Sequence, residues 1–192
     1  MAFFNLNRNT ERTISLSNEY DVLNFLNGLN DDDYVSADFA LRNSDIYSIV
    51  FLLSMDLANC EFKADKGKYQ ALLNKPTQTA NPHGFWESMF AQLLLDGNAY
   101  AYRWRNQNGT DNYWEYLRPS QVEPMLLEDG SSMVYNISFD EPEIGFMQNV
   151  PQNDMIHFRL MSRNGGKTGV SPLSALINEA QIQEQSNSLT KN

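Results

Sequence analysis

The sequence has 192 residues, a formal net charge of -10 and a pI near 4.6. It therefore lacks the surplus of Lys and Arg with which proteins neutralise nucleic-acid phosphates over a broad surface. One cysteine excludes an internal disulfide, and 42% hydrophobic residues are enough to build a core. No apolar run approaches the roughly 20 residues that span a bilayer, and the N-terminus lacks the apolar segment of a signal peptide. We expect one folded domain in a reducing cytoplasm.

Residues 1–43 are predicted to be a flexible arm that carries a short helix. The first 17 residues are polar and show no period. Ser17 or Asn18 is a suitable N-cap for a helix that ends before the acidic run at 31–33, which we interpret as a solvated loop.

Three helical segments follow the arm. The first begins at Ser44, and its apolar residues between 46 and 57 cover nearly all sides, which predicts a helix buried between two layers. A helical turn over 69–76 ends at a proline. The third begins at Asn81-Pro82, a cap followed by proline at the first helical position, and ends at Gly97.

From residue 98 the apolar period changes from that of a helix to two, the period of a strand. Turn residues separate the segments, so the pattern predicts hairpins. The fold class is α+β, with one antiparallel or mixed sheet of about five or six strands packed with helices. The expected strands cover 98–105, 113–117, 122–127, 133–139, 144–148 and 155–160.

Ser171-Pro172 predicts the start of a long last helix. The sequence stops at Asn192 without a helix stop signal, so we expect the natural chain to continue.

No arrangement of residues predicts catalysis, a cofactor or a metal. Gly166-Lys167-Thr168 matches the second half of a phosphate-binding loop, but Met161 stands where the first glycine belongs, which favours a flexible loop. Neither His83 nor His157 has a partner at metal-ligand spacing. Asp154 with His157 is the one acid–base pair worth weighing, and three residues apart on a strand they point to opposite faces.

A second hypothesis is an α+β interaction or nucleic-acid-binding module. Aromatic side chains can stack on bases, and five of them lie on the first predicted hairpin: Tyr100, Tyr102, Trp104, Tyr113 and Trp114. Their alternation suits one face of a hairpin, which favours core packing or a subunit contact over base stacking.

Four segments, in this order and spacing, resemble the portal proteins of long-tailed bacteriophages, also called head-to-tail connectors. The most distinctive is the second. The segments are Leu72-Leu73-Asn74-Lys75-Pro76 with Phe85-Trp86-Glu87; Leu93-Leu94-Leu95-Asp96-Gly97-Asn98-Ala99-Tyr100-Ala101; Leu117-Arg118-Pro119-Ser120-Gln121-Val122 with Asp129-Gly130 and Tyr135; and Asp154-Met155-Ile156-His157-Phe158-Arg159 with Gly169-Val170-Ser171-Pro172-Leu173. The resemblance covers roughly residues 44–180.

The resemblance implies a structural subunit without catalytic activity. Portal subunits form a ring, usually of twelve, at one capsid vertex of the virion. The ring is assembled in the host bacterial cytoplasm. It docks the large terminase subunit, the capsid or scaffold and the head-completion proteins, and duplex DNA passes through it without tight binding.

The resemblance also divides the chain and marks its motif residues. It implies a wing-like α+β domain over 44–170, preceded by the arm at 1–43 and followed at 171–192 by the start of a helix directed to the stem. We expect structural roles for the residues that the motifs share: Pro76, Trp86, Gly97, Asn98, Tyr100, Pro119, His157, Gly169, Ser171 and Pro172.

Overall fold

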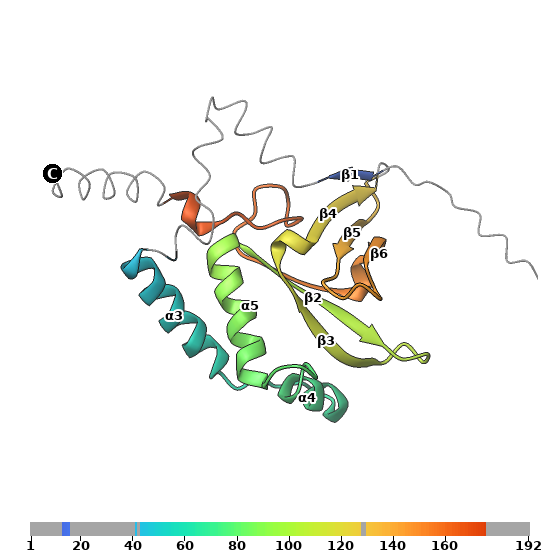
Figure 1. Ribbon diagram of the computed structural model, residues 1–192, viewed down its shortest axis with the longest axis horizontal. Helices are drawn as coiled ribbons and strands as arrows, with labels where there is room; N and C mark the ends of the chain where they lie inside the picture. The colour runs from blue at the N-terminus through green and yellow to red at the C-terminus, as the bar shows by residue number, and fades with distance from the viewer. Residues whose placement is uncertain (1–12, 16–40, 42, 128–129, 176–192) are drawn as a thin grey trace, which may run out of the picture.

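Two antiparallel sheets and three α-helices make up the part of the chain that the structure describes (Figure 1). The computed structural model describes residues 13–15, 41, 43–127 and 130–175. The predicted arm helix and most of the predicted last helix lie outside these residues. None of the described helices is long and apolar enough to cross a membrane.

Helix α3 (Ser44–Ala58) begins where the sequence predicts, because the Asn43 side chain accepts the N–H groups of Asp45 and Ile46. The prediction that it is buried between two layers is wrong. One row faces α5 and is buried, namely Val50, Ser54 and Ala58. The large apolar residues on the other sides are exposed: Tyr47, Ile49, Phe51, Leu52, Leu53 and Leu57. The apolar pattern identifies residues that can be buried, but it does not show whether another part of the fold covers them.

Helix α5 (Pro82–Asp96) lies between α3 and the three-stranded sheet (Figure 1). The Asn81 side chain caps it by accepting the N–H of Gly84, and Gly97 closes it at φ 79°, both as predicted. Its sheet-facing side buries Phe85, Trp86 and Met89. The shorter helix α4 (Gly67–Asn74) occupies the predicted helical turn.

The three-stranded sheet has the order β3-β2-β7, with β2 (Asn98–Arg105) in the centre between β3 (Asp111–Leu117) and β7 (Met155–Arg159). Successive β2 side chains point to opposite faces. Ala99 and Ala101 pack in the cluster under α5, whereas Tyr100 packs in a second cluster on the other face. The predicted first hairpin is confirmed.

The second sheet has the order β1-β4-β5-β6, in which β4 (Val122–Leu127), β5 (Met133–Ser138) and β6 (Phe146–Pro151) form a meander. The three-residue strand β1 (Thr13–Ser15), within the predicted arm, pairs with the edge of β4. The α+β class and the antiparallel pairing are confirmed, but the strands form two sheets instead of the single one predicted.

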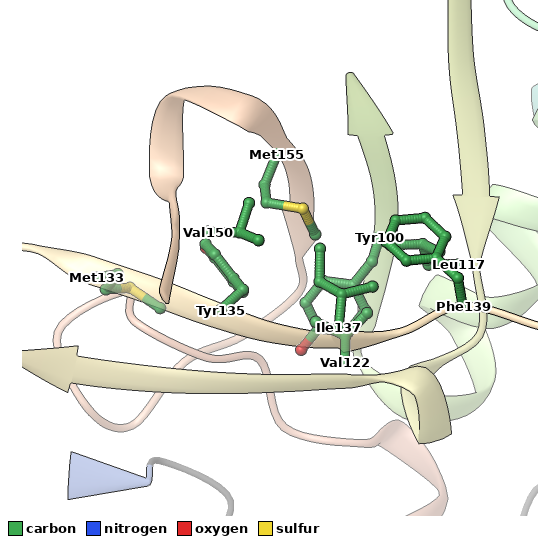
Figure 2. Close-up of a cluster of buried hydrophobic side chains, with 9 residues drawn as sticks. All are labelled: Tyr100, Leu117, Val122, Met133, Tyr135, Ile137, Phe139, Val150 and Met155. Atoms are coloured by element: carbon green, nitrogen blue, oxygen red, sulfur yellow. The ribbon is translucent and has the colours of Figure 1, made fainter. Parts of the chain in front are cut away.

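The division into two sheets begins at Pro119. The short 3₁₀ helix η2 (Pro119–Gln121) carries the chain from β3 in one sheet to β4 in the other. The Gln121 side chain fixes this corner by accepting the N–H of Arg118 and donating to the carbonyl of Ser138. Nine buried residues contributed by both sheets fill the core between them (Figure 2).

Candidate functional site

The carboxyl end of α5 meets the segment 169–173 at a partly buried polar site, which we call the Asn98 junction. It comprises Asp96, Gly97, Asn98, His157, Gly169 and Ser171. Asn98 is the first residue of β2, directly after the glycine that closes α5. Its side-chain Oδ1 accepts the N–H of Gly169 at 2.6 Å, and its Nδ2 donates to the carbonyl of Gly169 at 3.0 Å. One amide side chain thus pairs with both backbone groups of a residue 71 positions away.

Two glycines allow the backbones to approach at this junction. Gly97 has φ 79°, and a Cβ added there would lie 2.3 Å from the carbonyl oxygen of Val170. A Cβ on Gly169 would lie 2.0 Å from the carbonyl oxygen of Gly97. The Gly97 carbonyl also accepts the N–H of Leu160 at 2.9 Å. No side chain fits at either position without moving the backbone.

Ser171 fixes the start of the next helical segment. Its Oγ donates to the carbonyl of Leu95 at 2.6 Å and accepts the N–H of Leu173 at 3.2 Å. The 3₁₀ helix η4 (Pro172–Ala175) follows. The Leu173 side chain is buried in a cluster with Val50 of α3 and Leu95 of α5. The end of α5 therefore sets the position from which the chain continues.

His157 links the junction to the second sheet. Its Nε2 lies 3.1 Å from Asn98 Oδ1, and its Nδ1 accepts the N–H of Arg159 Nε at 3.1 Å. Because Nδ1 accepts a hydrogen bond, Nε2 carries the proton and donates it to Asn98. The hydroxyl of Tyr135, on β5, also lies 3.1 Å from Nδ1.

The His157 imidazole is neutral at physiological pH. Burial, together with the nearby Arg159 guanidinium, lowers its pKa to about 3. The Nδ1 lone pair accepts the Arg159 N–H and lies beside the Tyr135 hydroxyl, so it is not placed to take a proton from a substrate. Burial disfavours the charged form of the Asp96 carboxyl too, and for an acid this raises the pKa. The Asp96 carboxyl accepts a hydrogen bond from Asn98 Nδ2. No buried side-chain nitrogen or oxygen among the described residues lacks a hydrogen-bond partner.

Seven of the ten motif residues meet at or beside this junction. In addition to Gly97, Asn98, His157, Gly169 and Ser171, these are Pro172, which begins η4, and Tyr100, whose ring centroid lies 4.3 Å from that of His157. Sequence reasoning did not assign Arg159 or Asp96 to the site. Arg159 lies two residues after His157 on β7, and this strand spacing places both on one face.

The other three motif residues lie elsewhere and support the fold. Pro76 is fully buried, and its carbonyl accepts the N–H of Trp114 on β3. Trp86 packs edge-on against Trp114 and donates its indole N–H to the carbonyl of Leu73. Pro119 begins the corner between the sheets.

The acid–base pair weighed from the sequence is not assembled. Asp154 lies in the 3₁₀ helix η3 (Gln152–Asp154) and pairs with Arg105, 2.5 Å from its Nη2. Arg105 and Arg103 also contact Asp111. Burial alone would raise the pKa of Asp111, but hydrogen bonds from Arg103 and Trp114 hold it below its usual value. These ions neutralise one another at the end of the β2–β3 hairpin next to its turn.

The backbone N–H groups of the glycine-rich loop at 164–169 form hydrogen bonds within the loop and its flanking residues. Asn164 Oδ1 accepts the N–H groups of Lys167 and Thr168, and Ser162 Oγ accepts that of Gly166. The amides that would surround a phosphate in a phosphate-binding loop therefore close this loop instead. No group of three or more His, Cys, Asp or Glu side chains within the described ranges is arranged to hold a metal ion.

Comparison with known proteins identifies a matching family model and several solved structures with a similar fold. A family model described as phage portal protein matches residues 44–192. The solved structures titled "Neck of empty GTA particle computed with C6 symmetry" and "Virion of native gene transfer agent (GTA) particle" contain similar chains, with TM-scores of 0.68 and 0.67 at 16% and 17% identity. These matches cover 82% and 83% of this chain and 46% of each solved chain.

A third structure, titled "Neck of native GTA particle computed with C12 symmetry", matches with a TM-score of 0.63 at 14% identity. This match covers 95% of the present chain and 48% of the solved one. The chain thus spans about half the length of the solved chains that it resembles. No curated protein sequence matches it significantly.

The two sheets and the fully bonded junction define a scaffold domain, in which polar groups hold backbone segments together. The chain belongs to the phage portal protein family, as the match over residues 44–192 shows. The resemblance drawn from four sequence motifs is confirmed.

Proposed function

We propose that this chain is the N-terminal part of a portal subunit, which assembles with further copies into a ring at one vertex of a phage capsid. DNA enters and leaves the capsid through this ring. The observation that carries the proposal is the family match over residues 44–192, because it covers all three helices and six of the seven described strands. The likeness to neck chains solved with C6 and C12 symmetry supports it.

In this subunit, the Asn98 junction holds the domain in a fixed position relative to the chain that follows it. A ring that bears the force of DNA packaging needs a fixed relation between each outer domain and the rest of its chain. Gly169 is hydrogen-bonded to Asn98 at the start of β2, and Ser171 is hydrogen-bonded to Leu95 in the last turn of α5. Both lie immediately before the helical segment that leads onward. We therefore assign residues 44–170 to the wing and residues 171–192 to the route towards the stem.

The charge of the chain suits a conduit for DNA. A net charge of -10 opposes tight phosphate binding, so moving DNA is not trapped. The arginines near the first hairpin do not alter this, because Arg103 and Arg105 are paired with Asp111 and Asp154.

Assembly partners and location follow from the same proposal. The ring contains twelve subunits, is assembled in the bacterial cytoplasm and remains in the virion. Its partners are the large terminase subunit, the capsid or scaffold, and the head-completion proteins. The chain itself is not an enzyme and binds no cofactor, and ATP hydrolysis belongs to the terminase.

The structure does not favour the nucleic-acid-binding alternative. Tyr100 is buried in the core between the sheets, and Tyr102 and Trp104 pack against the same cluster. Trp114 is on the opposite face of the sheet, in the cluster beneath α5, so the five aromatic residues do not form one surface.

Electron microscopy of the full-length protein tests the proposal. Negative-stain images and mass photometry of the full-length gene product are expected to show rings with a central hole wide enough for duplex DNA. The 192-residue chain, measured in parallel, shows how much of the assembly residues 1–192 direct. A full-length product that stays monomeric or dimeric at all concentrations contradicts the proposal.

A further inference from the structure

A group of exposed lysines lies around helix α4, in a chain whose net charge is negative. Four of the six lysines in the sequence fall in this one stretch, and all four are exposed: Lys63, Lys66, Lys68 and Lys75. Within the described residues only Lys63 has an ion pair, with Glu61, and the two side chains are 76% and 78% exposed. Tyr69 is 44% exposed, and the ammonium group of Lys68 lies over its ring. We call the four lysines and Tyr69 the lysine patch.

A second charged surface surrounds the turn that joins β5 to β6. It consists of one half-buried carboxylate of β3 and three exposed ones of the turn: Glu115, Asp140, Glu141 and Glu143. Arg118 pairs with Asp140 at 2.7 Å, and the other three carboxylates have no ion pair within the described part of the chain. Phe146, the first residue of β6, follows this turn and is 58% exposed. We call the four carboxylates and Phe146 the acidic patch.

The carboxylates of the acidic patch repel one another. Burial raises the pKa of Glu115 above its ordinary value, and the charges of Glu141 and Asp140 raise it further. The hydrogen bond that Glu115 accepts from the Trp104 indole only opposes this shift. A cation brought to this surface from outside would relieve the repulsion. The acidic patch is therefore suited to a positively charged partner.

The two patches lie on opposite faces of the three-stranded sheet. Leu73 of α4 packs in the cluster beneath α5, which also contains Trp114. Phe139, which begins the acidic turn, packs in the cluster on the other face, against Tyr102 and Trp104. The sheet and its two clusters thus separate the patches within one chain, so a contact between them joins two copies.

A ring requires such a pair of surfaces. In a closed ring of more than two identical subunits, each copy meets the next through two different surfaces on its two sides. The necks that contain chains of similar fold were solved with C6 and C12 symmetry. Complementary charges across an interface steer association and fix its register, and aromatic side chains are enriched in interface cores. The lysine patch and the acidic patch supply opposite charge and one exposed aromatic side chain each.

We propose that the lysine patch of each subunit packs against the acidic patch of the next subunit around the ring. This inference rests on the proposed function and names the surfaces through which the ring forms. A second copy is favoured over DNA as the partner of the lysines, because one contact between copies neutralises both patches. Phosphates bound to the lysines would leave the acidic patch unpaired.

Charge exchange in the full-length protein tests the proposal. Lys66→Glu combined with Lys68→Glu places like charges opposite each other, and is expected to lower the fraction of subunits in rings at least about fivefold. Adding Glu141→Lys and Glu143→Lys to this variant makes the two surfaces complementary again, and is expected to restore the rings. Mass photometry and negative-stain images measure the fraction. All four side chains are exposed, so the melting temperature should stay that of the wild type.

Arg163→Glu combined with Lys167→Glu is the matched control, since it reverses two positive charges on the glycine-rich loop, outside both patches. It is expected to leave the rings intact. Unchanged rings in the lysine variant overturn the proposal, and so does a fourfold variant without rings, because the lysines then face another surface. Unchanged rings together with weaker binding of duplex DNA assign the lysines to DNA and overturn it too. A wild-type protein that forms no rings refutes the proposed function itself.

A second measurement uses the wild-type rings. A carbodiimide joins a lysine amine to a carboxylate in direct contact, forming an amide with loss of water. Digestion and mass spectrometry are expected to find the segment 63–75 linked to the segment 139–145, and to find this link in rings but not in monomers. Rings in which these lysines are linked only to other segments contradict the proposal while leaving ring formation in place.

Discussion

The Asn98 junction lies at the carboxyl end of α5, and helix α3 packs along α5. The two regions differ from the usual pattern of buried apolar and exposed polar side chains in opposite ways. At the junction, Asn98 is buried, its polar partners are half-buried, and they are hydrogen-bonded to one another. On α3, Leu52 and Tyr47 are large and apolar, yet most of their side-chain surface is exposed. Buried polar groups are costly unless paired, and exposed apolar groups are costly unless covered.

The difference shows which part of this domain is complete in itself. The junction closes with groups that the described residues supply, so it needs nothing further. On the outer side of α3, the described residues leave large apolar side chains uncovered. Substitutions in the two regions should therefore have very different effects on the free energy of unfolding.

The largest effect is expected for Gly97→Ala. The new methyl group would lie 2.3 Å from the Val170 carbonyl oxygen, on a residue with φ 79°. We expect a loss of about 3 kcal/mol or more in the free energy of unfolding, measured by urea denaturation. Gly165→Ala is the control, because Gly165 also has positive φ, 73°, but nothing lies within 4 Å of the added Cβ. It should cost only about 1 kcal/mol. Equal losses would mean that backbone conformation, and not close packing, selects glycine at the junction.

A smaller effect is expected from the titration of His157. Its native pKa of about 3 lies below the ordinary value of 6.5, so below pH 6.5 the unfolded chain gains a proton that the folded chain does not. Stability should therefore fall as the pH drops from 6.5 towards 3, and His157 should contribute nothing to the pH dependence above 6.5. Between pH 7 and pH 5 the contribution amounts to about 2 kcal/mol.

His157→Gln removes this contribution, so its unfolding free energy should vary less between pH 7 and pH 5 than that of the wild type. The control His83→Gln removes the other histidine, which lies on α5 with 39% of its side chain exposed. Urea denaturation at pH 5, 6 and 7 gives the slope of the unfolding free energy against pH for the wild type and for each of the two variants. A wild-type slope in His157→Gln would refute a neutral, buried His157.

The smallest effect is expected on the exposed side of α3. Leu52 is 60% exposed, so Leu52→Ala should change the free energy of unfolding by less than about 0.5 kcal/mol. Val50→Ala on the same helix removes fewer carbon atoms but should cost about 2 kcal/mol, because Val50 is only 8% exposed. A larger loss for Leu52→Ala would show that this side of α3 is already covered.

The sequence predicts local elements of this fold better than their arrangement. The caps at Asn81 and Gly97 act through neighbouring residues, so α5 could be placed almost to the residue. The separation into two sheets could not, because strand pairing joins distant segments and the direction of the Pro119 corner is not encoded in a short pattern. The exposure of α3 was missed for the same reason: an apolar residue does not reveal whether its partner is present.

The sequence predicted which residues belong to the candidate site, but it did not predict how these residues are arranged in space. Gly97, Asn98 and Gly169 were selected because they resemble family motifs, and the structure shows that they lie in contact. Their separation of about 70 residues carries no spacing rule that would have joined them. The contact between His157 and Asn98 required the register of β7 against β2.

The pairing of Asn98 with Gly169 also has a consequence for the order of synthesis. A contact between residues 71 positions apart forms only after the intervening chain has been made and folded, and such distant contacts are slow to close. The two sheets can assemble as soon as β7 leaves the ribosome, but the junction closes only when Gly169 and Ser171 follow. Because domains fold as units during translation, we expect the two sheets to be in place before the junction closes.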